Sequence, residues 1–319
     1  MLFCLLCFLN FSIQSKLKIG MAMKVCIKGF IVFIVLFYSC APAKKTDNSL
    51  LFAKQNLVAW CIVPFDSVER TPEERAMMLH ELGITQLAYD WRLKHLSSFQ
   101  DELKSLKNHD IKLKSVWIWI ENDSTAILDS ANQVILDVLK SQQIATDLWV
   151  GFSIKYFEGL SDDQKLDKGV KAVEYLQKKA SGIGCTLNLY NHGDWFGDPR
   201  NQIRIIEKSG LKNIGMVYNF HHAHQQVDDF PNLLPKMLPY LKTVNLDGIK
   251  IDGPKILTLG EGDKELEMLR TLKASGYNGS IGIIGHIETE DVKVVLERNI
   301  EGLKTLLKLM DDKKALASY

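Results

Sequence analysis

The chain has 319 residues, of which 46% are apolar and 24% are charged, so it can build a sizeable core and lacks the composition of a disordered protein. Its 39 basic and 38 acidic side chains give a formal charge of only +1. This balance argues against a nucleic-acid groove or a polybasic membrane patch. It favours a small, weakly charged ligand.

Residues 1–40 have the features of an export signal. Lys24 and Lys28 precede the apolar run 30–38, which is too short to cross a bilayer comfortably. The run ends at Cys40 after a small residue, a pattern that resembles a lipoprotein signal with an acylated cysteine. We therefore expect an exported chain, anchored by a lipid at Cys40 to a bacterial-type envelope membrane, in the periplasm or at the cell surface. A cleaved secretory signal and a plain membrane anchor are the alternatives.

The cysteines say little about chemistry. Four of the six lie in this leader, which leaves Cys61 and Cys185. Two cysteines cannot build a disulfide framework or a Cys-rich zinc site. Both fall inside apolar runs, so we expect buried and inert thiols.

The rest of the chain alternates short apolar runs with longer stretches of helical period, which is typical of repeated βα units. The helical pattern 72–82 has Thr71 as N-cap and Gly83 as its end, and another spans 291–307. The eight predicted strands are 57–63, 84–89, 112–119, 147–153, 184–190, 214–219, 242–247 and 280–285.

Eight such units fit a closed (β/α)8 TIM barrel, which needs about 250 residues. We expect a single barrel domain over 57–319, preceded by a tether over 41–56. An open doubly wound sheet is the rival architecture. It is disfavoured because no first βα turn carries a Gly-x-Gly-x-x-Gly phosphate-binding pattern.

Polar residues follow nearly every predicted strand, at the end of the barrel where such folds place their active sites. Five of the eight histidines fall in these loops, whereas His80, His95 and His109 fall in helical positions and are expected at the surface. Neutral imidazoles beside carboxylates suit a divalent metal or a proton relay. The candidate site residues, in strand order, are Asp90, Arg92, Glu121, Lys155, Glu158, Asn191, His192, Trp195, Asn219, His222, His224, Asn245, Asp247 and His286.

Several of these stretches resemble the successive motifs of xylose isomerase-like barrels, a superfamily with sugar isomerases, sugar epimerases and the AP endonuclease family 2 fold. They are 189–193 (Leu-Tyr-Asn-His-Gly), 219–222 (Asn-x-x-His), 244–247 (Val-Asn-Leu-Asp) and 277–279 (Tyr-x-Gly). The resemblance covers nearly all of the chain after the leader. Each motif is short, so its specificity comes from the order of the motifs.

The resemblance implies one divalent cation held by two glutamates, an aspartate and a histidine, but this chain departs from that set. Tyr190, Asn219 and Asn245 stand where the family has Glu, Asp and His, and its last Glu falls near Gly285 and His286. Only His222 and Asp247 keep the expected types. A remodelled site for Mn²⁺, Zn²⁺ or a similar ion stays open, with candidate ligands His222, Asp247, His224, His286, Glu121 and Glu158.

The resemblance implies a carbohydrate-active enzyme that moves a proton next to a carbonyl, as isomerases and epimerases do. We expect His192 or His222 as the base and Lys155 to stabilise the developing enolate oxygen. Substrate contacts are expected from Asp90, Arg92, Asn191, Trp195, Asn219 and Asn245. Export argues against a sugar phosphate and for a free sugar, keto-sugar or glycoside.

Two other functions stay open at this point. A keto-sugar lyase or hydratase begins with the same proton abstraction. A surface protein that binds carbohydrate without turning it over would explain the altered metal ligands. A nucleic-acid repair enzyme is disfavoured by the lack of basic excess.

Overall fold

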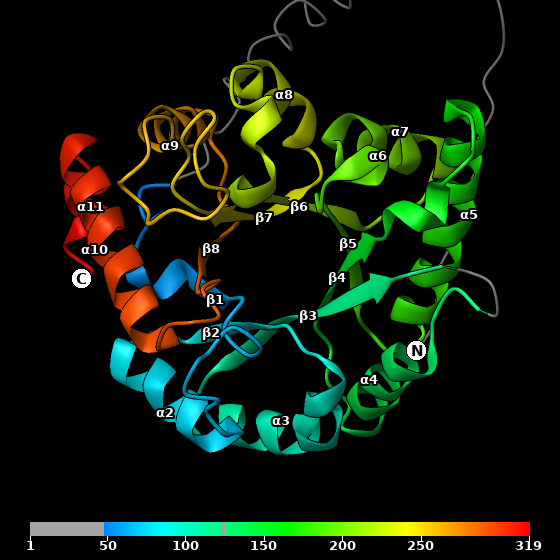
Figure 1. Ribbon diagram of the computed structural model, residues 1–319, viewed down its shortest axis with the longest axis horizontal. Helices are drawn as coiled ribbons and strands as arrows, with labels where there is room; N and C mark the ends of the chain where they lie inside the picture. Colours follow the sequence, from blue (N-terminus) through cyan, green and yellow to red (C-terminus); the bar gives the residue numbers. More distant parts are fainter. Residues whose placement is uncertain (1–47, 123–125) are drawn as a thin grey trace, which may run out of the picture. The chain divides into compact units, whose positions relative to one another are not determined.

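The computed structural model describes residues 48–122 and 126–319. Eight parallel strands close into a barrel in the order β1 to β8, and helices surround them (Figure 1). This confirms the predicted (β/α)8 TIM barrel. The strands are Leu57–Trp60 (β1), Gln86–Tyr89 (β2), Lys112–Ile120 (β3), Asp147–Phe152 (β4), Thr186–Tyr190 (β5), Ile214–Asn219 (β6), Leu241–Leu246 (β7) and Ser280–Ile284 (β8).

The helices begin and end at the signals that the sequence carries. Thr71 and Glu74 form a capping box at the start of α2, and Gly83 ends that helix with a φ of 68°. The α-helices are Pro72–Leu82 (α2), Phe99–Asn108 (α3), Ser130–Ser141 (α4), Asp162–Ser181 (α5), Asp194–Gly197 (α6), Pro199–Ser209 (α7), Phe230–Met237 (α8), Glu265–Ala274 (α9), Val292–Leu309 (α10) and Lys313–Leu316 (α11). Short 3-10 turns are Lys54–Asn56 (η1), Leu93–Ser98 (η2), Ile154–Phe157 (η3), Phe220–His222 (η4) and His224–Gln226 (η5).

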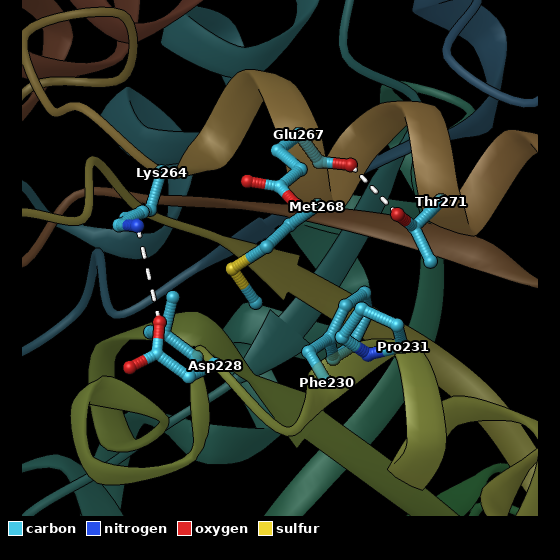
Figure 2. Close-up of a pocket in the computed structure, with 8 residues that line it drawn as sticks. Asp228, Phe230, Pro231, Lys264, Glu267, Met268 and Thr271 are labelled. Atoms are coloured by element: carbon cyan, nitrogen blue, oxygen red, sulfur yellow. Dashed lines mark hydrogen bonds and ion pairs between the residues drawn. The ribbon is translucent and has the colours of Figure 1, made fainter.

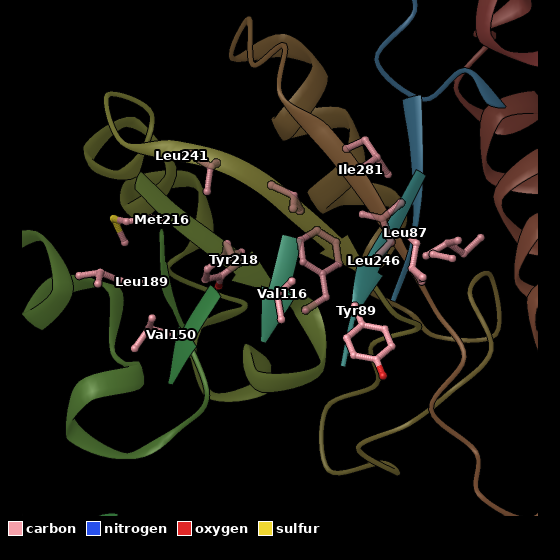
Figure 3. Close-up of a cluster of buried hydrophobic side chains, with 14 of the residues drawn as sticks. Leu87, Tyr89, Val116, Val150, Leu189, Met216, Tyr218, Leu241, Leu246 and Ile281 are labelled. Carbon is pink, nitrogen blue, oxygen red and sulfur yellow. The ribbon is translucent and has the colours of Figure 1, made fainter. Parts of the chain in front are cut away.

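The strands bury both of their faces, because side chains alternate between the barrel interior and the helix layer. One apolar set lies between the strands and the helices; Figure 3 shows members of it, including Tyr89, Val116 and Leu189. The other set fills the interior and is rich in aromatic residues. Its members are Val58, Trp60, Cys61, Phe65, Ala88, Trp117, Trp149, Tyr190, Val217 and Ile284.

Glycines make room for polar side chains inside the barrel. Gly282 on β8 pairs in register with Asn245 on β7, and a Cβ at Gly282 would lie 1.9 Å from Asn245 Oδ1. Gly215 on β6 pairs with Asn188 on β5 in the same way, with 2.1 Å to Asn188 Oδ1. Both glycines are therefore fixed by close packing.

The strand boundaries differ from the predicted ones mainly at the first strand. β1 ends at Trp60 rather than at residue 63, because Cys61 turns the chain with a φ of 55°. Leu51 and Phe52, within the predicted tether, are buried in the core. Cys61 and Cys185 are both buried, as expected, and burial raises the pKa of each thiol.

The leader and Cys40 lie outside the described residues, so export and lipidation stay predictions. Among residues 48–122 and 126–319, no helix combines the length and the apolar character needed to cross a membrane.

Candidate active site

A cavity of about 260 Å³ opens where the strands end, at the side of the barrel to which their carboxyl ends point. Six of the eight strands or the loops that directly follow them contribute to it, namely β1, β2, β3, β5, β6 and β8. The lining residues are Trp60, Cys61, Phe65, Asp90, Arg92, Trp117, Tyr190, His192, Asn219, His221, His222, His286 and Glu288.

Aromatic rings form the apolar part of this cavity. The Trp117 and Tyr190 ring centroids lie 4.9 Å apart, and those of Trp60 and Tyr190 lie 5.7 Å apart. Trp149 packs on Trp60 at 4.9 Å, next to the cavity, and is fully buried. Flat apolar surfaces of this kind suit the C–H face of a sugar ring.

The hydroxyl of Tyr190 is held by two hydrogen-bond donors. Trp60 Nε1 donates to it at 2.9 Å, and the side-chain amide of Asn219 donates to it as well. The orientation of that amide is fixed because Asn219 Oδ1 accepts a hydrogen bond of 3.0 Å from the backbone N–H of His221. Burial raises the pKa of Tyr190, so the phenol keeps its proton.

Two carboxylates line the cavity, Asp90 and the exposed Glu288, and Asp90 is the buried one. It is 2% exposed, and its Oδ1 accepts a hydrogen bond of 3.3 Å from the backbone N–H of Val63. Its Oδ2 is buried and has no hydrogen-bond partner among the described residues. Burial raises the pKa of Asp90 to about 6, within reach of neutrality.

Four imidazoles form a continuous row along the cavity. The ring centroids are 4.5 Å apart for His192 and His222, 4.4 Å for His222 and His221, and 5.2 Å for His221 and His286. The His221 Nδ1 lies 2.9 Å from the carbonyl of Lys255. Because a carbonyl only accepts, Nδ1 carries the proton and Nε2 keeps its lone pair.

These imidazoles are neutral near pH 7. Burial is the main cause that lowers the pKa of each, to about 2 for His222 and about 4 for His286. Burial also lowers the pKa of His221 and that of His192. The His192 ring packs on Trp119, although part of the residue is exposed at the mouth of the cavity. The row therefore offers hydrogen bonds rather than positive charge.

The residues predicted to bind a metal do not come together. His222 and His286 line the cavity, but His224 does not. Asp247 Oδ2 lies 3.8 Å from His221 Nδ1, whose proton is already directed at a carbonyl. Burial raises the pKa of Asp247, which favours its protonated form.

The other predicted ligands lie outside the cavity lining. Glu121 pairs with the predicted catalytic Lys155 at 2.8 Å, with side chains 43% and 66% exposed, and also accepts a hydrogen bond from Trp119. Glu158 is exposed. Within residues 48–122 and 126–319, no three His, Cys, Asp or Glu side chains are grouped so that they could hold a metal ion. The described residues therefore do not fit the divalent cation that the resemblance implies.

The predicted substrate-binding residues divide between cavity and framework. Asp90, Arg92 and Asn219 line the cavity, and the Arg92 guanidinium lies 5.3 Å from the centre of the Phe65 ring. The other three, Asn191, Trp195 and Asn245, do not line the cavity. Asn191 joins β5 to β6 through two hydrogen bonds to the backbone of Asn219, Trp195 donates to Asp162, and Asn245 is fully buried.

The end of the first strand was not predicted to belong to the site. The prediction relied on polar residues at strand ends, and Trp60 and Cys61 are not polar. It also treated Tyr190 only as a departure from a metal ligand. Its position directly before Asn191 and His192, at a strand end, was the signal that could have placed it in the site.

Fold and site together define a class: this is a (β/α)8 TIM barrel with an aromatic and imidazole-rich cavity, and its fold is similar to that of xylose isomerase-like barrels. The chain is similar in structure to the 3-keto-D-glucoside 4-epimerase YcjR from E. coli, with 14% identity, a TM-score of 0.62 and coverage of 79% of this chain and 100% of that one. It is also similar to the IolI protein with a bound zinc atom, at 11% identity, a TM-score of 0.59 and coverage of 79% and 98%.

A third similar structure is the probable 3-DHS dehydratase AsbF from Bacillus anthracis, at 12% identity, a TM-score of 0.57 and coverage of 75% and 97%. No family model matches this sequence. No curated protein matches it either. At such low identities these likenesses establish the fold.

Other cavities in the described part of the chain lack the row of imidazoles that lines this one. One of about 110 Å³ lies between α8 and α9 on the outside of the barrel, where Lys264 and Asp228 form an ion pair of 3.8 Å (Figure 2). One of about 420 Å³ lies at the amino ends of the strands and is lined by Lys114, Asn188 and Lys242 among others. The site is therefore assigned by its chemistry rather than by its size.

Proposed function

We propose that this protein is a carbohydrate-active enzyme that removes a proton from the carbon next to a carbonyl, in the manner of a sugar isomerase or epimerase. The proposal rests on Asp90, a buried residue that lines the cavity. Its Oδ2 makes no hydrogen bond with a described residue, and its pKa is raised to about 6. A general base of this kind works best when its pKa lies near the working pH.

Asp90 takes the role of the base in this proposal, in place of the predicted His192 or His222. Both imidazoles have lowered pKa values, and that of His222 falls to about 2, which makes it a weak proton acceptor. Their ring nitrogens, and the lone pair on His221 Nε2, suit the hydroxyl groups of a sugar. The imidazole row therefore orients the substrate.

The reaction begins when the C–H bond next to the carbonyl breaks and its proton moves to Asp90 Oδ2. The electron pair of that bond moves towards the carbonyl oxygen, giving an enol or enolate. Return of a proton to the same carbon from the other face gives an epimer. Its delivery to the former carbonyl carbon gives an isomer, provided that the hydroxyl proton of the first carbon moves to the original carbonyl oxygen. Loss of a group from the adjacent carbon instead gives the lyase or hydratase reaction.

The substrate we propose is an uncharged, unphosphorylated keto-sugar or glycoside. Among the described residues that line the cavity, Arg92 is the one Lys or Arg side chain, and it lies at the exposed mouth. A phosphate group is usually bound by several such cations or by a helix amino end. The predicted export of the chain supports the same substrate class.

The test measures exchange of a carbon-bound proton with solvent. Purified full-length protein is incubated in D2O with methyl 3-keto-D-glucopyranoside and with a set of free ketohexoses, and loss of the proton signal next to the carbonyl is followed by NMR. Asp90→Asn should slow the exchange at least about 100-fold, the usual contribution of a general base. Exchange at the wild-type rate in this variant would contradict the proposal.

Asp167→Asn is the matched control. Asp167 makes a surface ion pair with Lys208 on the outer helices and is 58% exposed. This variant should exchange at the wild-type rate. Binding of these sugars without any exchange by the wild-type protein would instead favour a carbohydrate-binding protein without turnover.

A further inference from the structure

The chain fills the metal-ligand positions of its fold relatives with neutral hydrogen-bonding groups. Tyr190, Asn219 and Asn245 stand at three positions where the resemblance predicts Glu, Asp and His. Two of them are joined, since the Asn219 amide donates to the Tyr190 hydroxyl. The third, Asn245, is buried beside the Tyr190 hydroxyl, close enough for its side chain to act on the pKa of that phenol.

The proton of the Tyr190 hydroxyl is left available to a ligand. Its oxygen already accepts two hydrogen bonds, from Trp60 Nε1 and from the Asn219 amide. A phenol offers one O–H donor, and among the described residues no hydrogen bond leads from the Tyr190 hydroxyl to another group. Tyr190 lines the cavity and is 1% exposed, so the hydroxyl is a buried donor on the cavity wall.

Two donors on one phenol oxygen also strengthen its own hydrogen bond. They withdraw electron density from the oxygen, and hydrogen bonds in a chain polarise one another in a buried site. The surrounding rings of Trp60 and Trp117 keep water from competing. The arrangement resembles an oxyanion hole, in which preorganised donors face the oxygen on which negative charge develops.

We propose that the Tyr190 hydroxyl binds and polarises the carbonyl oxygen of the substrate, and that this donor acts in place of the divalent metal ion of similar barrels. The inference rests on the proposed function for its catalytic part, because a carbonyl must be polarised when the adjacent proton leaves. Asp90 then receives the proton while Tyr190 stabilises the oxygen. The step moves one proton and one electron pair within the site and needs no redox partner.

Binding tests the donor role without requiring turnover. Methyl 3-keto-D-glucopyranoside and methyl D-glucopyranoside differ at one carbon, which carries a carbonyl in the first and a hydroxyl in the second. Their affinities are measured by the tryptophan fluorescence of the full-length protein. The wild type should prefer the keto compound about fivefold or more, roughly what one buried hydrogen bond supplies. Tyr190→Phe should lose this preference.

Tyr218→Phe is the matched control. Tyr218 is buried on β6, on the face that packs on the helices, and its hydroxyl lies 3.4 Å from Gln226 Oε1. This variant should keep the wild-type preference. The proposal is overturned if Tyr190→Phe still prefers the keto compound, or if the wild type shows no preference.

Kinetics and metal content separate the inference from the proposed function. In the exchange assay Tyr190→Phe should lower kcat about 100-fold or more with a KM within a few-fold, as expected for an oxyanion donor. Elemental analysis should find no stoichiometric divalent metal in the active protein.

A wild type that exchanges protons while Tyr190→Phe exchanges equally well refutes the inference alone. A wild type that shows the Tyr190-dependent preference but exchanges no proton refutes the proposed function alone.

Discussion

Trp60 and Tyr190 are 130 residues apart in the chain, yet Trp60 Nε1 donates a hydrogen bond of 2.9 Å to the Tyr190 hydroxyl inside the barrel. β1 and β5, which end at these two residues, lie opposite each other in the ring of strands. The bond therefore spans the interior. It positions a phenol in the wall of the cavity that Asp90 and the four imidazoles also line.

Trp60→Phe tests how much this bond contributes. The variant removes one of the two donors to Tyr190, so the phenol becomes a weaker donor to the substrate. We expect proton exchange to slow by about 5- to 20-fold, less than in Tyr190→Phe, which removes the donor itself. Trp149→Phe is the control, because the buried Trp149 Nε1 has no hydrogen-bond partner among the described residues. Equal rates in Trp60→Phe and wild type would contradict this account.

The pH dependence of exchange should follow Asp90. A base acts in its ionised form, and burial raises the pKa of Asp90 to about 6. The rate should therefore fall below a pH of about 6 and reach a plateau above it, which a pH profile of kcat/KM measures. The histidines should add no second step near neutrality, since the pKa of each cavity imidazole is lowered by burial. A profile whose acidic limb lies at pH 4 would exclude Asp90.

The buried Asp90 carboxyl should lower the free energy of unfolding at neutral pH. Its pKa is raised from 3.8 in the unfolded chain to about 6 in the fold, so the folded state retains a proton that the unfolded state releases. Its contribution to stability is favourable below pH 3.8 and is lost as the pH rises through 6. Asp90→Asn should thus increase the free energy of unfolding at pH 7 by about 1–3 kcal/mol, and by less at pH 4. Urea unfolding at the two pH values checks this, and a variant that is less stable at pH 7 would contradict it.

Gly282 should tolerate no side chain while Asn245 faces it. An alanine Cβ would lie 1.9 Å from Asn245 Oδ1, so Gly282→Ala should destabilise the barrel by about 1–3 kcal/mol through overpacking. Asn245→Ala removes the clashing atoms. The double variant should therefore be more stable than the sum of the two single changes predicts, as measured by urea unfolding. Additive effects would show that the two positions do not interact.

The barrel could be predicted from the sequence because the alternation of apolar runs and helical patterns repeats eight times. The end of the barrel that holds the candidate site also followed, since active sites of this fold lie at the carboxyl ends of the strands. The end of β1 was missed, and the loops after β4 and β7 do not line the cavity. What each side chain does there did not follow. Asn191 and His192 are adjacent, yet Asn191 bonds to the backbone of Asn219 and His192 lines the cavity.

Lys155 illustrates the same limit. It lies in η3 directly after β4, but its ammonium pairs with Glu121 and it does not line the cavity. Loop turns and long-range partners set these directions, and neither is encoded in spacing along the chain. Trp60 is the opposite case, an apolar strand residue whose N–H reaches a phenol on the far side of the barrel.

The most direct test of the account is proton exchange in the presence of a chelator. Exchange of methyl 3-keto-D-glucopyranoside in D2O is followed with the full-length wild type before and after treatment with EDTA, and again after addition of Mn²⁺, Zn²⁺ or Mg²⁺. The account predicts the same exchange rate in all three conditions, because Asp90 and the Tyr190 hydroxyl supply the chemistry. Loss of exchange with EDTA and its recovery with one of these ions would contradict it.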